Sequence, residues 1–219
     1  MSKALLSADE ILGALDAEQR VVAETTRGPV RVLAGAGTGK TRAITHRIAY
    51  GVATGVYTPD KVLALTFTNR AAGEMRTRLR HLGAGAVTAQ TFHSSALRQV
   101  NHFWEQLTGA SAPHVLEGKA RMISEVARAC GLKADTATLR DVAAEIEWRK
   151  VSNLSIEQYA VKAHTRTLPG GLTVDDMVRV SEGYEKLKDD RAQIDWEDVL
   201  LLCAGMLESE RTALMQVRD

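Results

Sequence analysis

A glycine-rich octapeptide holds the residues with the clearest chemistry in this chain. It reads Ala34-Gly35-Ala36-Gly37-Thr38-Gly39-Lys40-Thr41, and it lies between an apolar run, residues 30–33, and a helix-patterned segment, residues 42–53. Glycines let backbone N–H groups turn around an anion, and a helix start adds partial positive charge. Lys40 can reach phosphate oxygens, and the Thr41 hydroxyl can ligate Mg²⁺. The pattern predicts a strand, a phosphate loop and a helix, in that order.

The octapeptide departs from the usual Gly-x4-Gly-Lys-Ser/Thr pattern at Ala34, where the first glycine is expected. A plain glycine-rich turn is the alternative interpretation, although the flanking strand and helix patterns favour phosphate binding. Gln19 lies 21 residues before Lys40. An amide both donates and accepts hydrogen bonds, so Gln19 could read the edge of adenine; an ordinary surface glutamine is the alternative.

The elements around the octapeptide follow from periodicity and turn residues. Residues 7–24 predict one or two amphipathic helices, with Asp16 as an N-cap. The near-continuous apolar run 61–67 predicts a buried parallel strand, and 87–90 predicts a third strand. Helices are predicted over 71–82 and from Thr91 to about Leu107. Strands that alternate with helices indicate an α/β fold with a parallel sheet.

Two polar-aromatic loops follow the second and third predicted strands, at the sheet edge where ligands bind in such folds. Hydroxyls and amides can hold phosphates, and an aromatic ring can stack on a base, so a single-strand nucleic-acid track is one interpretation. The other is that both phenylalanines are core residues and the hydroxyls are helix caps. The loops read Thr66-Phe67-Thr68-Asn69-Arg70 and Gln90-Thr91-Phe92-His93-Ser94.

The pattern changes after Gly109, where no strand-like alternation is visible. Four helices are predicted, over 117–130, 139–151, 156–163 and 174–188, and a further amphipathic helix over 196–207. This indicates an inserted all-helical unit. Three acidic groups in this half follow no apolar strand, so we interpret them as helix caps or solvated faces; they are Asp175-Asp176, Asp189-Asp190 and Asp195/Glu197/Asp198.

Composition is that of an ordinary globular protein, with 219 residues, 45% hydrophobic and 25% charged. No apolar run is long enough for a membrane span or a signal-peptide core, and Cys130 and Cys203 show no CxxC spacing. We therefore expect a reducing, cytoplasmic location with packed thiols and no membrane partner. The net charge is only +1, but residues 27–80 carry a net +8 and residues 175–219 a net −6. The basic region suggests a polyanion-facing surface; two solvated faces of opposite sign are the alternative.

Taken together, the motifs resemble the UvrD/PcrA/Rep-type superfamily 1 DNA helicases, in family order and over the whole chain. Residues 15–20 resemble the Q motif, and 34–41 are similar to the phosphate loop, in which alanine is common at the first position. Residues 65–76 look like motif Ia, Thr91-Phe92-His93-Ser94 looks like motif Ib, and 194–201 resemble a D-F-x-D-L-L helix. The sequence of residues 144–150 resembles that of actinobacterial members of these helicases.

The resemblance implies ATP-driven 3′–5′ translocation on single-stranded DNA and unwinding at single-strand/duplex junctions, in repair or replication, with ATP and Mg²⁺ as cofactors. It implies that Gln19 reads adenine, that Arg42 and Arg78 flank the nucleotide, and that Lys40 and Thr41 serve phosphate and metal. Arg70 replaces a frequent lysine and keeps its charge. The implied DNA track consists of Phe67, Thr68, Asn69, Arg70, Thr91, Phe92 and His93.

The resemblance also implies the domain organisation: residues 1–110 as the first part of a RecA-like subdomain 1A, 111–193 as helical subdomain 1B, and 194–219 as a helix returning to 1A. The Asp-Glu-x-x-Asp strand and domains 2A and 2B of relatives lie beyond these residues. We therefore expect the polypeptide alone to bind nucleotide weakly without hydrolysing it, and the sheet to be left with an exposed edge. The alternatives are a small P-loop kinase or GTPase, and a non-catalytic nucleotide- or DNA-binding module with a vestigial loop.

Overall fold

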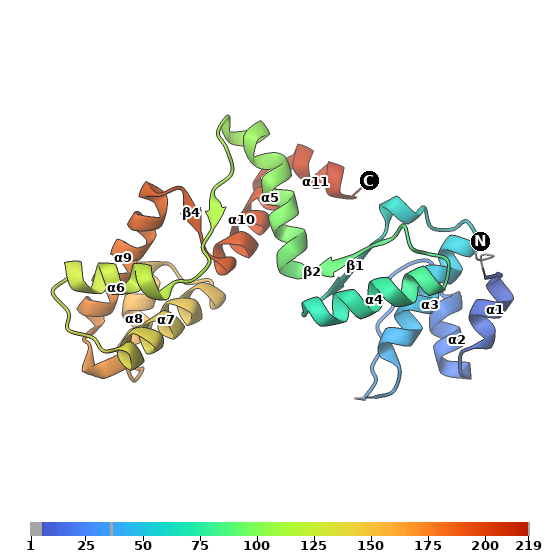
Figure 1. Ribbon diagram of the computed structural model, residues 1–219, viewed down its shortest axis with the longest axis horizontal. Coiled ribbons are helices and arrows are strands. Elements are labelled where there is room, and N and C mark those ends of the chain that lie inside the picture. Colours follow the sequence, from blue (N-terminus) through green and yellow to red (C-terminus); the bar gives the residue numbers. More distant parts are fainter. Residues whose placement is uncertain (1–5, 36, 219) are drawn as a thin grey trace. The chain divides into compact units, whose positions relative to one another are not determined.

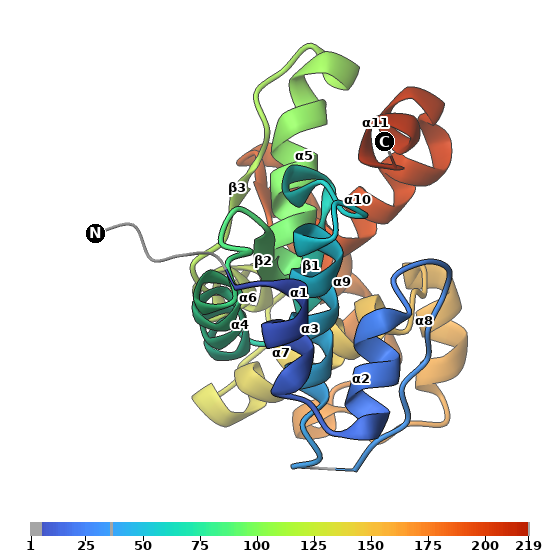
Figure 2. The same cartoon turned by 90° about the vertical axis from the view of Figure 1, so that its right-hand side faces the viewer.

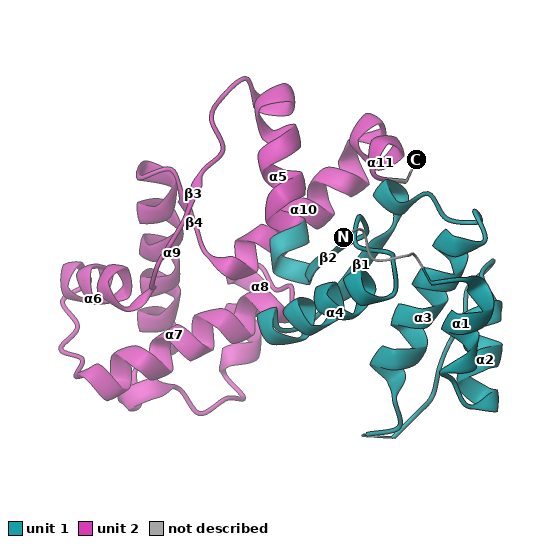
Figure 3. Cartoon of the chain, turned by 45° about the vertical axis from the view of Figure 1, so that its right-hand side comes forward, with its two compact units in different colours: residues 1–95, 219 teal, residues 96–218 magenta. Residues whose placement is uncertain are grey.

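The structure is a computed structural model that describes residues 6–35 and 37–218. The chain divides into two compact units, the first ending at Ser95 and the second spanning Ala96–Arg218 (Figure 3). Most of the described residues are helical, and two small parallel sheets accompany the helices. This architecture is compatible with the predicted α/β class. The predicted subdomain limits at residues 110 and 193 stay predictions.

The first unit contains helices around one short sheet (Figure 1). Helices α1, α2 and α4 all pack against α3. Figure 2 shows the extended chain after α2 running alongside that helix before it reaches α3. The elements are α1 (Ala8–Gly13), α2 (Ala17–Glu24), α3 (Lys40–Ala53), η1 (Pro59–Lys61), β1 (Leu63–Thr66), α4 (Asn69–His81), β2 (Thr88–Thr91) and α5 (Phe92–Thr108), which continues into the second unit.

Side-chain N-caps lie at the starts of α2 and α4. Asp16 accepts a hydrogen bond from the Gln19 backbone N–H at 2.8 Å, which confirms the predicted N-cap of α2. Thr68 caps α4 in the same way through the Ala71 N–H. α3 differs, because it begins after Gly39 with a left-handed backbone and no side-chain cap. The phosphate-loop segment therefore enters its helix in a conformation that favours glycine.

The sheet of the first unit has two parallel strands, β1 and β2, with Leu63 opposite Thr88 and Thr66 opposite Thr91. The predicted strand over 30–33 is wrong. A strand is stabilised by hydrogen bonds to a neighbour, and no described strand pairs with this segment, although its backbone is extended. Leu33 is 80% exposed.

The prediction that residues 61–67 form a fully buried strand is also wrong in part. β1 is shorter and buries alternate side chains, so that Ala64 and Thr66 are buried while Leu63 is 45% exposed. One edge of β1 pairs with β2, and no described strand pairs with the other edge. Arg76 on α4 donates to the Ala89 carbonyl of β2 at 3.0 Å and so ties the helix to the sheet.

The core of the first unit forms where α1, α3 and α4 meet the sheet. On α4, Met75 and Leu79 lie four positions apart on one helix face, and their burial with side chains of α1 and α3 removes apolar surface from water. The buried members are Ile11, Ile48, Ala49, Ala64, Met75, Leu79, Ala84, Val87 and Ala89.

The second unit confirms the four predicted helices and the helix after Asp195, but it is not wholly helical. β3 pairs in parallel with β4, with His114 opposite Gln193, and two-residue strands are too short to show an alternating pattern. The elements are β3 (His114–Val115), α6 (Ala120–Ala129), α7 (Thr136–Val151), α8 (Ile156–Ala163), η2 (Pro169–Gly171), α9 (Val174–Asp190), β4 (Gln193–Ile194), α10 (Trp196–Ser209) and α11 (Arg211–Arg218).

A buried ionic cluster ties α7 and α9 to the start of α10. Asp195 is the N-cap of α10, as predicted for a capping acid, but it is only 1% exposed rather than solvated. Its carboxylate accepts hydrogen bonds from Lys150 at 2.7 Å and from the Tyr184 hydroxyl at 3.1 Å. Lys188 also pairs with Asp198 and, at 3.4 Å, with Asp195. The apolar core beside this cluster consists of Met122, Ile123, Val126, Val142, Ile146, Tyr159, Ala163, Met177, Val180 and Tyr184.

Candidate nucleotide and nucleic-acid site

The phosphate-loop segment leads into α3 through two left-handed glycines. Gly37 has φ of 78° and Gly39 has φ of 83°, a region that other residues enter only with strain. Ala36 lies outside the described residues, so its predicted contact with nucleotide is not described. The helix predicted after the loop is confirmed, and the strand predicted before it is not; phosphate binding by the loop stays a prediction.

Lys40 bends back over its own loop. Its ammonium donates to the Ala34 carbonyl at 2.8 Å and also to the Gly35 carbonyl. The Thr38 hydroxyl donates to the same Gly35 carbonyl at 2.9 Å. These bonds place a lysine cation directly at the loop. To hold a phosphate, Lys40 would exchange these carbonyl oxygens for the oxygens of the ligand.

Gln19 and the loop line one cavity of about 320 Å³. The Gln19 side-chain nitrogen donates to the Thr38 carbonyl at 3.3 Å. A Cβ added to Gly39 would lie 2.5 Å from that nitrogen, so the amide packs directly on the glycine. Two residues that lie 20 positions apart are thereby brought together. The remaining lining residues are Asp16, Glu18, Val22, Val32, Leu33, Ala34, Gly35, Thr38, Lys40 and Ala43.

The other predicted nucleotide contacts lie elsewhere in the first unit. The exposed Arg42 donates through Nη2 to the Ala14 carbonyl at the end of α1. Arg78 is exposed near the end of α4. Neither residue lines the Gln19 cavity, so their contact with nucleotide stays a prediction. Thr41 lies half-buried in the first turn of α3. It is the predicted metal ligand, and the described residues contain no group of three or more His, Cys, Asp or Glu that could hold a metal.

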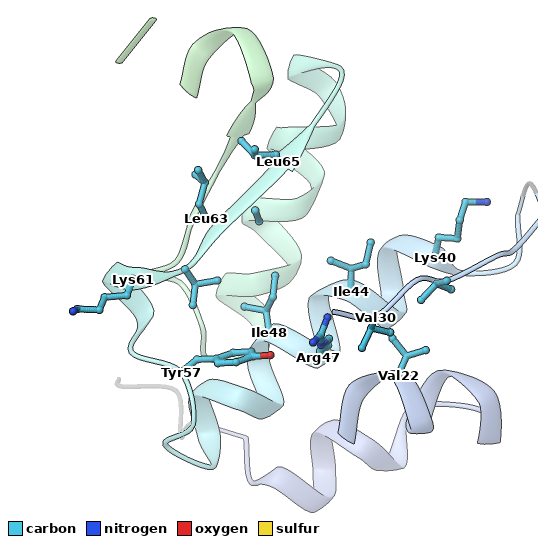
Figure 4. A pocket seen from close by; sticks show the side chains of 13 residues that line it. Val22, Val30, Lys40, Ile44, Arg47, Ile48, Tyr57, Lys61, Leu63 and Leu65 are labelled. Atoms are coloured by element: carbon cyan, nitrogen blue, oxygen red, sulfur yellow. The ribbon is translucent and has the colours of Figure 1, made fainter. Parts of the chain in front are cut away.

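A second cavity, of about 580 Å³, lies between α3 and β1 and shares Lys40 with the first (Figure 4). Its walls are mostly apolar, and its charged lining residues are the cations Lys40, Arg47 and Lys61. Arg47 donates to the Gly28 carbonyl at 3.3 Å, while its buried Nε has no hydrogen-bond partner among the described residues. The Tyr57 hydroxyl, which is directed towards Arg47 in Figure 4, bonds the Thr26 carbonyl.

Sequence reasoning missed Arg47 and Tyr57. One signal was available, because Gly51 is a glycine inside an otherwise regular helix and such a residue often marks a close approach. In the structure, a Cβ at Gly51 would lie 2.2 Å from the Tyr57 ring. Arg47 and Tyr57 together hold residues 26–28, which lead towards the phosphate loop.

An aromatic pair stands exposed where β1 and β2 end. Phe67 is 87% exposed and Phe92 is 43% exposed, and their ring centroids lie 5.2 Å apart with the planes tilted by 35°. The interpretation that these are core residues is therefore wrong. The in-register ends of the parallel strands bring the two rings together across 25 positions of sequence.

The hydroxyls beside this pair do act as caps. The Thr68 hydroxyl accepts from the Ala71 N–H, and the buried Thr91 hydroxyl accepts from the Ser94 N–H at 3.1 Å and donates to the Ser94 hydroxyl. Asn69 and Arg70 are exposed, and Arg70 pairs with Glu74 in the next turn at 3.1 Å; His93 is half-buried. Any contact of these residues with DNA stays a prediction.

One buried titratable group lies next to the site. His46 donates through Nδ1–H to the Arg42 carbonyl at 2.8 Å and is 8% exposed. Burial lowers the pKa of His46 below its ordinary value; the backbone hydrogen bond to Arg42 opposes this shift in part, and the charges of Arg42 and Arg78 lower the pKa further.

The residues described above lie within a region that matches a known protein family. Residues 15–219 match the family described as UvrD/REP helicase N-terminal domain, which covers nearly the whole chain. The chain belongs to this family. The match begins at the Q-motif-like segment and includes both polar-aromatic loops, so the UvrD/REP resemblance is confirmed.

Individual helicases that are similar in sequence to this chain support the same family membership. The chain is 42% identical to the ATP-dependent DNA helicase UvrD2 of Mycobacterium bovis and of Mycobacterium tuberculosis, over 98% of this chain and 32% of each relative. It is 46% identical to PcrA of Staphylococcus epidermidis over 38% of this chain and 12% of the relative, and 44% identical to PcrA of Bacillus subtilis over 41% and 13%. The chain thus spans about a third of the length of its UvrD2 relatives.

Two further sequence expectations can be compared with the structure. Both Cys130 and Cys203 are free and half-buried, as expected for packed thiols. Within residues 6–35 and 37–218, no helix is both long enough and apolar enough to cross a membrane. The cytoplasmic location stays a prediction.

Proposed function

We propose that this chain is the N-terminal motor part of an ATP-dependent DNA helicase that couples ATP hydrolysis to 3′–5′ movement on single-stranded DNA and to duplex unwinding, in DNA repair or replication. The convergence of Gln19 and the phosphate loop on one cavity carries this proposal. The family match supports it, as does the similarity to UvrD2 and PcrA, which are ATP-dependent DNA helicases. The first unit is then part of a RecA-like P-loop fold.

In this function, ATP with Mg²⁺ occupies the cavity that is lined by Gln19 and the phosphate loop. Lys40 turns from its loop carbonyls to the phosphates, and the Thr41 hydroxyl in the first turn of α3 ligates the metal, which offsets phosphate charge. Gln19 reads the adenine edge. The N–H groups at the start of α3 add partial positive charge towards the phosphates.

Single-stranded DNA, including the strand at a junction with duplex, lies across the ends of β1 and β2. The exposed Phe67–Phe92 pair supplies a stacking surface for bases. Asn69 and Arg70, exposed beside Phe67, face the backbone phosphates. Thr91 contributes as the cap that orders the start of α5 rather than as a free hydroxyl, because its side chain is buried.

The remaining parts of the motor are partners of this chain. Domains 2A and 2B close the nucleotide site. A further strand, apolar along its length and ending in carboxylates, enters the cavity between α3 and β1. Three observations favour that occupant: the cavity is apolar, its charged lining residues are cations, and the outer edge of β1 lacks a described partner. Carboxylates on that strand would complete the Mg²⁺ site and orient the water for hydrolysis.

Titration of the 219-residue polypeptide with a fluorescent non-hydrolysable ATP analogue and Mg²⁺ tests the proposal. Saturable binding is expected, and Lys40→Ala is expected to abolish it. Lys61→Ala is the matched control, since it removes another lysine of the same unit that lines only the second cavity. No binding, or equal binding by the Lys40→Ala variant, would contradict the nucleotide role. DNA-stimulated ATP hydrolysis by the pure polypeptide would contradict the proposed division of the active site.

A non-catalytic binding module with a vestigial loop is the second candidate. The folded-back Lys40 favours it, because its ammonium is already satisfied by two carbonyl oxygens. In that case single-stranded DNA would bind, whereas the ATP analogue would not. The same titration therefore separates the two functions.

A further inference from the structure

The segment that leads into the phosphate loop has few ties to the rest of the first unit. Its backbone runs extended from Gly28 towards Ala34 after α2 (Figure 2), and no described strand pairs with it. Residues 29–33 form no hydrogen bond with any other described residue. The hydrogen bonds that lie nearest to the loop on this side are therefore those at residues 26–28.

Two side chains tie residues 26–28 to α3 and to the turn that follows it (Figure 4). Arg47 of α3 donates through Nη2 to the Gly28 carbonyl at 3.3 Å. The Tyr57 hydroxyl, from the turn after α3, donates to the Thr26 carbonyl. Because the two bonds reach backbone oxygens two residues apart, they fix both the position and the direction of the chain at this point.

Tyr57 is itself held firmly against α3. Its backbone N–H donates to the Gly51 carbonyl at 2.9 Å. Its ring covers Gly51 so closely that a Cβ at this glycine would lie 2.2 Å from a ring carbon. The lack of a side chain at Gly51 thus lets the Tyr57 hydroxyl reach Thr26.

We propose that Arg47 and Tyr57 are positioning residues for phosphate binding, and that they act by fixing the segment that carries the phosphate loop. α3 then determines both ends of this segment, because Lys40 begins the helix and Gly28 is tied to it. An extended chain has little slack, so release of Gly28 would displace the Ala34 carbonyl, to which Lys40 is bonded. A loop that is ordered beforehand binds its ligand at a lower entropic cost.

The inference rests on the proposed nucleotide function and concerns residues outside the cavity of Gln19 and the phosphate loop. Neither Arg47 nor Tyr57 lines that cavity. Their effect should therefore be the same for a ligand with a base and for one without a base.

The first test removes one hydrogen bond and keeps the packing of the ring. Dissociation constants of the 219-residue polypeptide are measured for tripolyphosphate and for a non-hydrolysable ATP analogue, both with Mg²⁺. Tyr57→Phe is expected to weaken both about threefold, a part of the effect of one hydrogen bond. Tyr50→Phe is the matched control, because Tyr50 is half-buried on α3 and its hydroxyl has no hydrogen bond to a described residue. Both affinities should stay unchanged in this control.

Arg47→Met separates the positioning role from charge and from stability. The buried Arg47 Nε has no partner among the described residues, so the substitution removes an unsatisfied donor while it breaks the bond to Gly28. We expect the urea midpoint to change little and both affinities to fall about fivefold. Lys61→Met removes another cation from the same cavity and should leave the affinities unchanged. Arg47→Lys keeps a donor and should restore part of the affinity that Arg47→Met loses.

Limited digestion with trypsin gives a readout that needs no ligand. Arg27 and Arg31 are exposed in the segment, and cleavage after them depends on how often the segment leaves its place. Cleavage at these two sites should be faster in Tyr57→Phe and Arg47→Met than in the unaltered protein and the two controls. Cleavage within the second unit should keep its rate in all of them.

The possible outcomes separate this inference from the proposed function. Unchanged cleavage at the two sites, unchanged affinity for both ligands, or a loss for the ATP analogue alone would overturn the inference. So would an equal loss of affinity in the Tyr50→Phe or Lys61→Met control. If the unaltered protein binds neither ligand, or if Lys40→Ala leaves binding unchanged, the proposed function fails and the inference fails with it.

Discussion

Lys150 and Asp195 form a buried ion pair, with the lysine Nζ 2.7 Å from the aspartate Oδ2 and both residues at most 4% exposed. Burial alone would raise the pKa of Asp195, but the charges of Lys150 and Lys188 hold it below its ordinary value, so the carboxylate stays ionised. The pair joins α7 to the start of α10, segments 45 positions apart. Such a pair fixes the arrangement of helices more clearly than it adds net stability, because both charges lose hydration.

Breaking this pair from one side is expected to be costly. Lys150→Met leaves Asp195 buried with one cation fewer, and we expect unfolding free energy to fall by about 3–5 kcal/mol. Urea denaturation followed by circular dichroism measures this. The control is Lys162→Met on α8, where the lysine is exposed and the change is expected to stay within about 0.5 kcal/mol. Equal midpoints for the two variants would mean that the cluster is not a stabilising contact.

Stability is expected to depend on His46 at mildly acidic pH. Because burial lowers the pKa of His46 in the folded protein, the unfolded chain binds more protons as pH falls below the ordinary value of 6.5. The contribution of neutral His46 to the unfolding free energy is full above about pH 6.5, and it declines as the pH falls towards the lowered pKa. Thermal melts between pH 7.5 and 5 measure the slope. His46→Gln should flatten this slope, whereas His102→Gln, at an exposed position, should leave the slope unchanged. The same slope in the unaltered protein and in both variants would contradict the assignment of the pH dependence to His46.

Two glycines of the phosphate loop are expected to differ in their response to alanine. Both have positive φ, so either substitution introduces about 1–2 kcal/mol of backbone strain. Only at Gly39 would the new Cβ also meet the Gln19 nitrogen, since nothing lies within 4 Å of such an atom at Gly37. Gly39→Ala should therefore weaken binding of the ATP analogue more than Gly37→Ala. Because Gln19 is proposed to read adenine, the recovery is tested with tripolyphosphate, which has no base: Gln19→Ala should restore part of the binding that Gly39→Ala loses, and no recovery would show that the clash is not the cause.

The exposed aromatic pair is expected to bind single-stranded DNA by stacking. Phe67→Ala should weaken binding of a short oligonucleotide by roughly 1–3 kcal/mol without unfolding the protein, because Phe67 is 87% exposed. Fluorescence anisotropy at two salt concentrations measures this, and higher salt should weaken binding through the phosphate contacts. Val56→Ala, another exposed apolar position of the first unit, is the control. Equal affinity of the Phe67→Ala and Val56→Ala variants would exclude a stacking role.

Local patterns were enough to predict most elements and the composition of the site. The Asp16 cap, the helix after Lys40 and the helices of the second unit depend on residues within one or two turns, so their signals are contained in short windows of sequence. The same windows predicted a strand at 30–33, which was wrong. An apolar run indicates burial, but a strand also requires a neighbour, and pairing is not a local property.

The sequence by itself therefore determined the helices, the glycine-rich loop with Lys40, and membership of the UvrD/REP family. Only the tertiary structure decided that Gln19 packs on Gly39, that Arg42 is directed to Ala14, and that Phe67 meets Phe92 outside the core. It also placed Asp195 in an interior ionic cluster instead of on a solvated face. The physical reason is that these contacts join residues far apart in the chain, and their energies depend on how packing orients whole helices and strands.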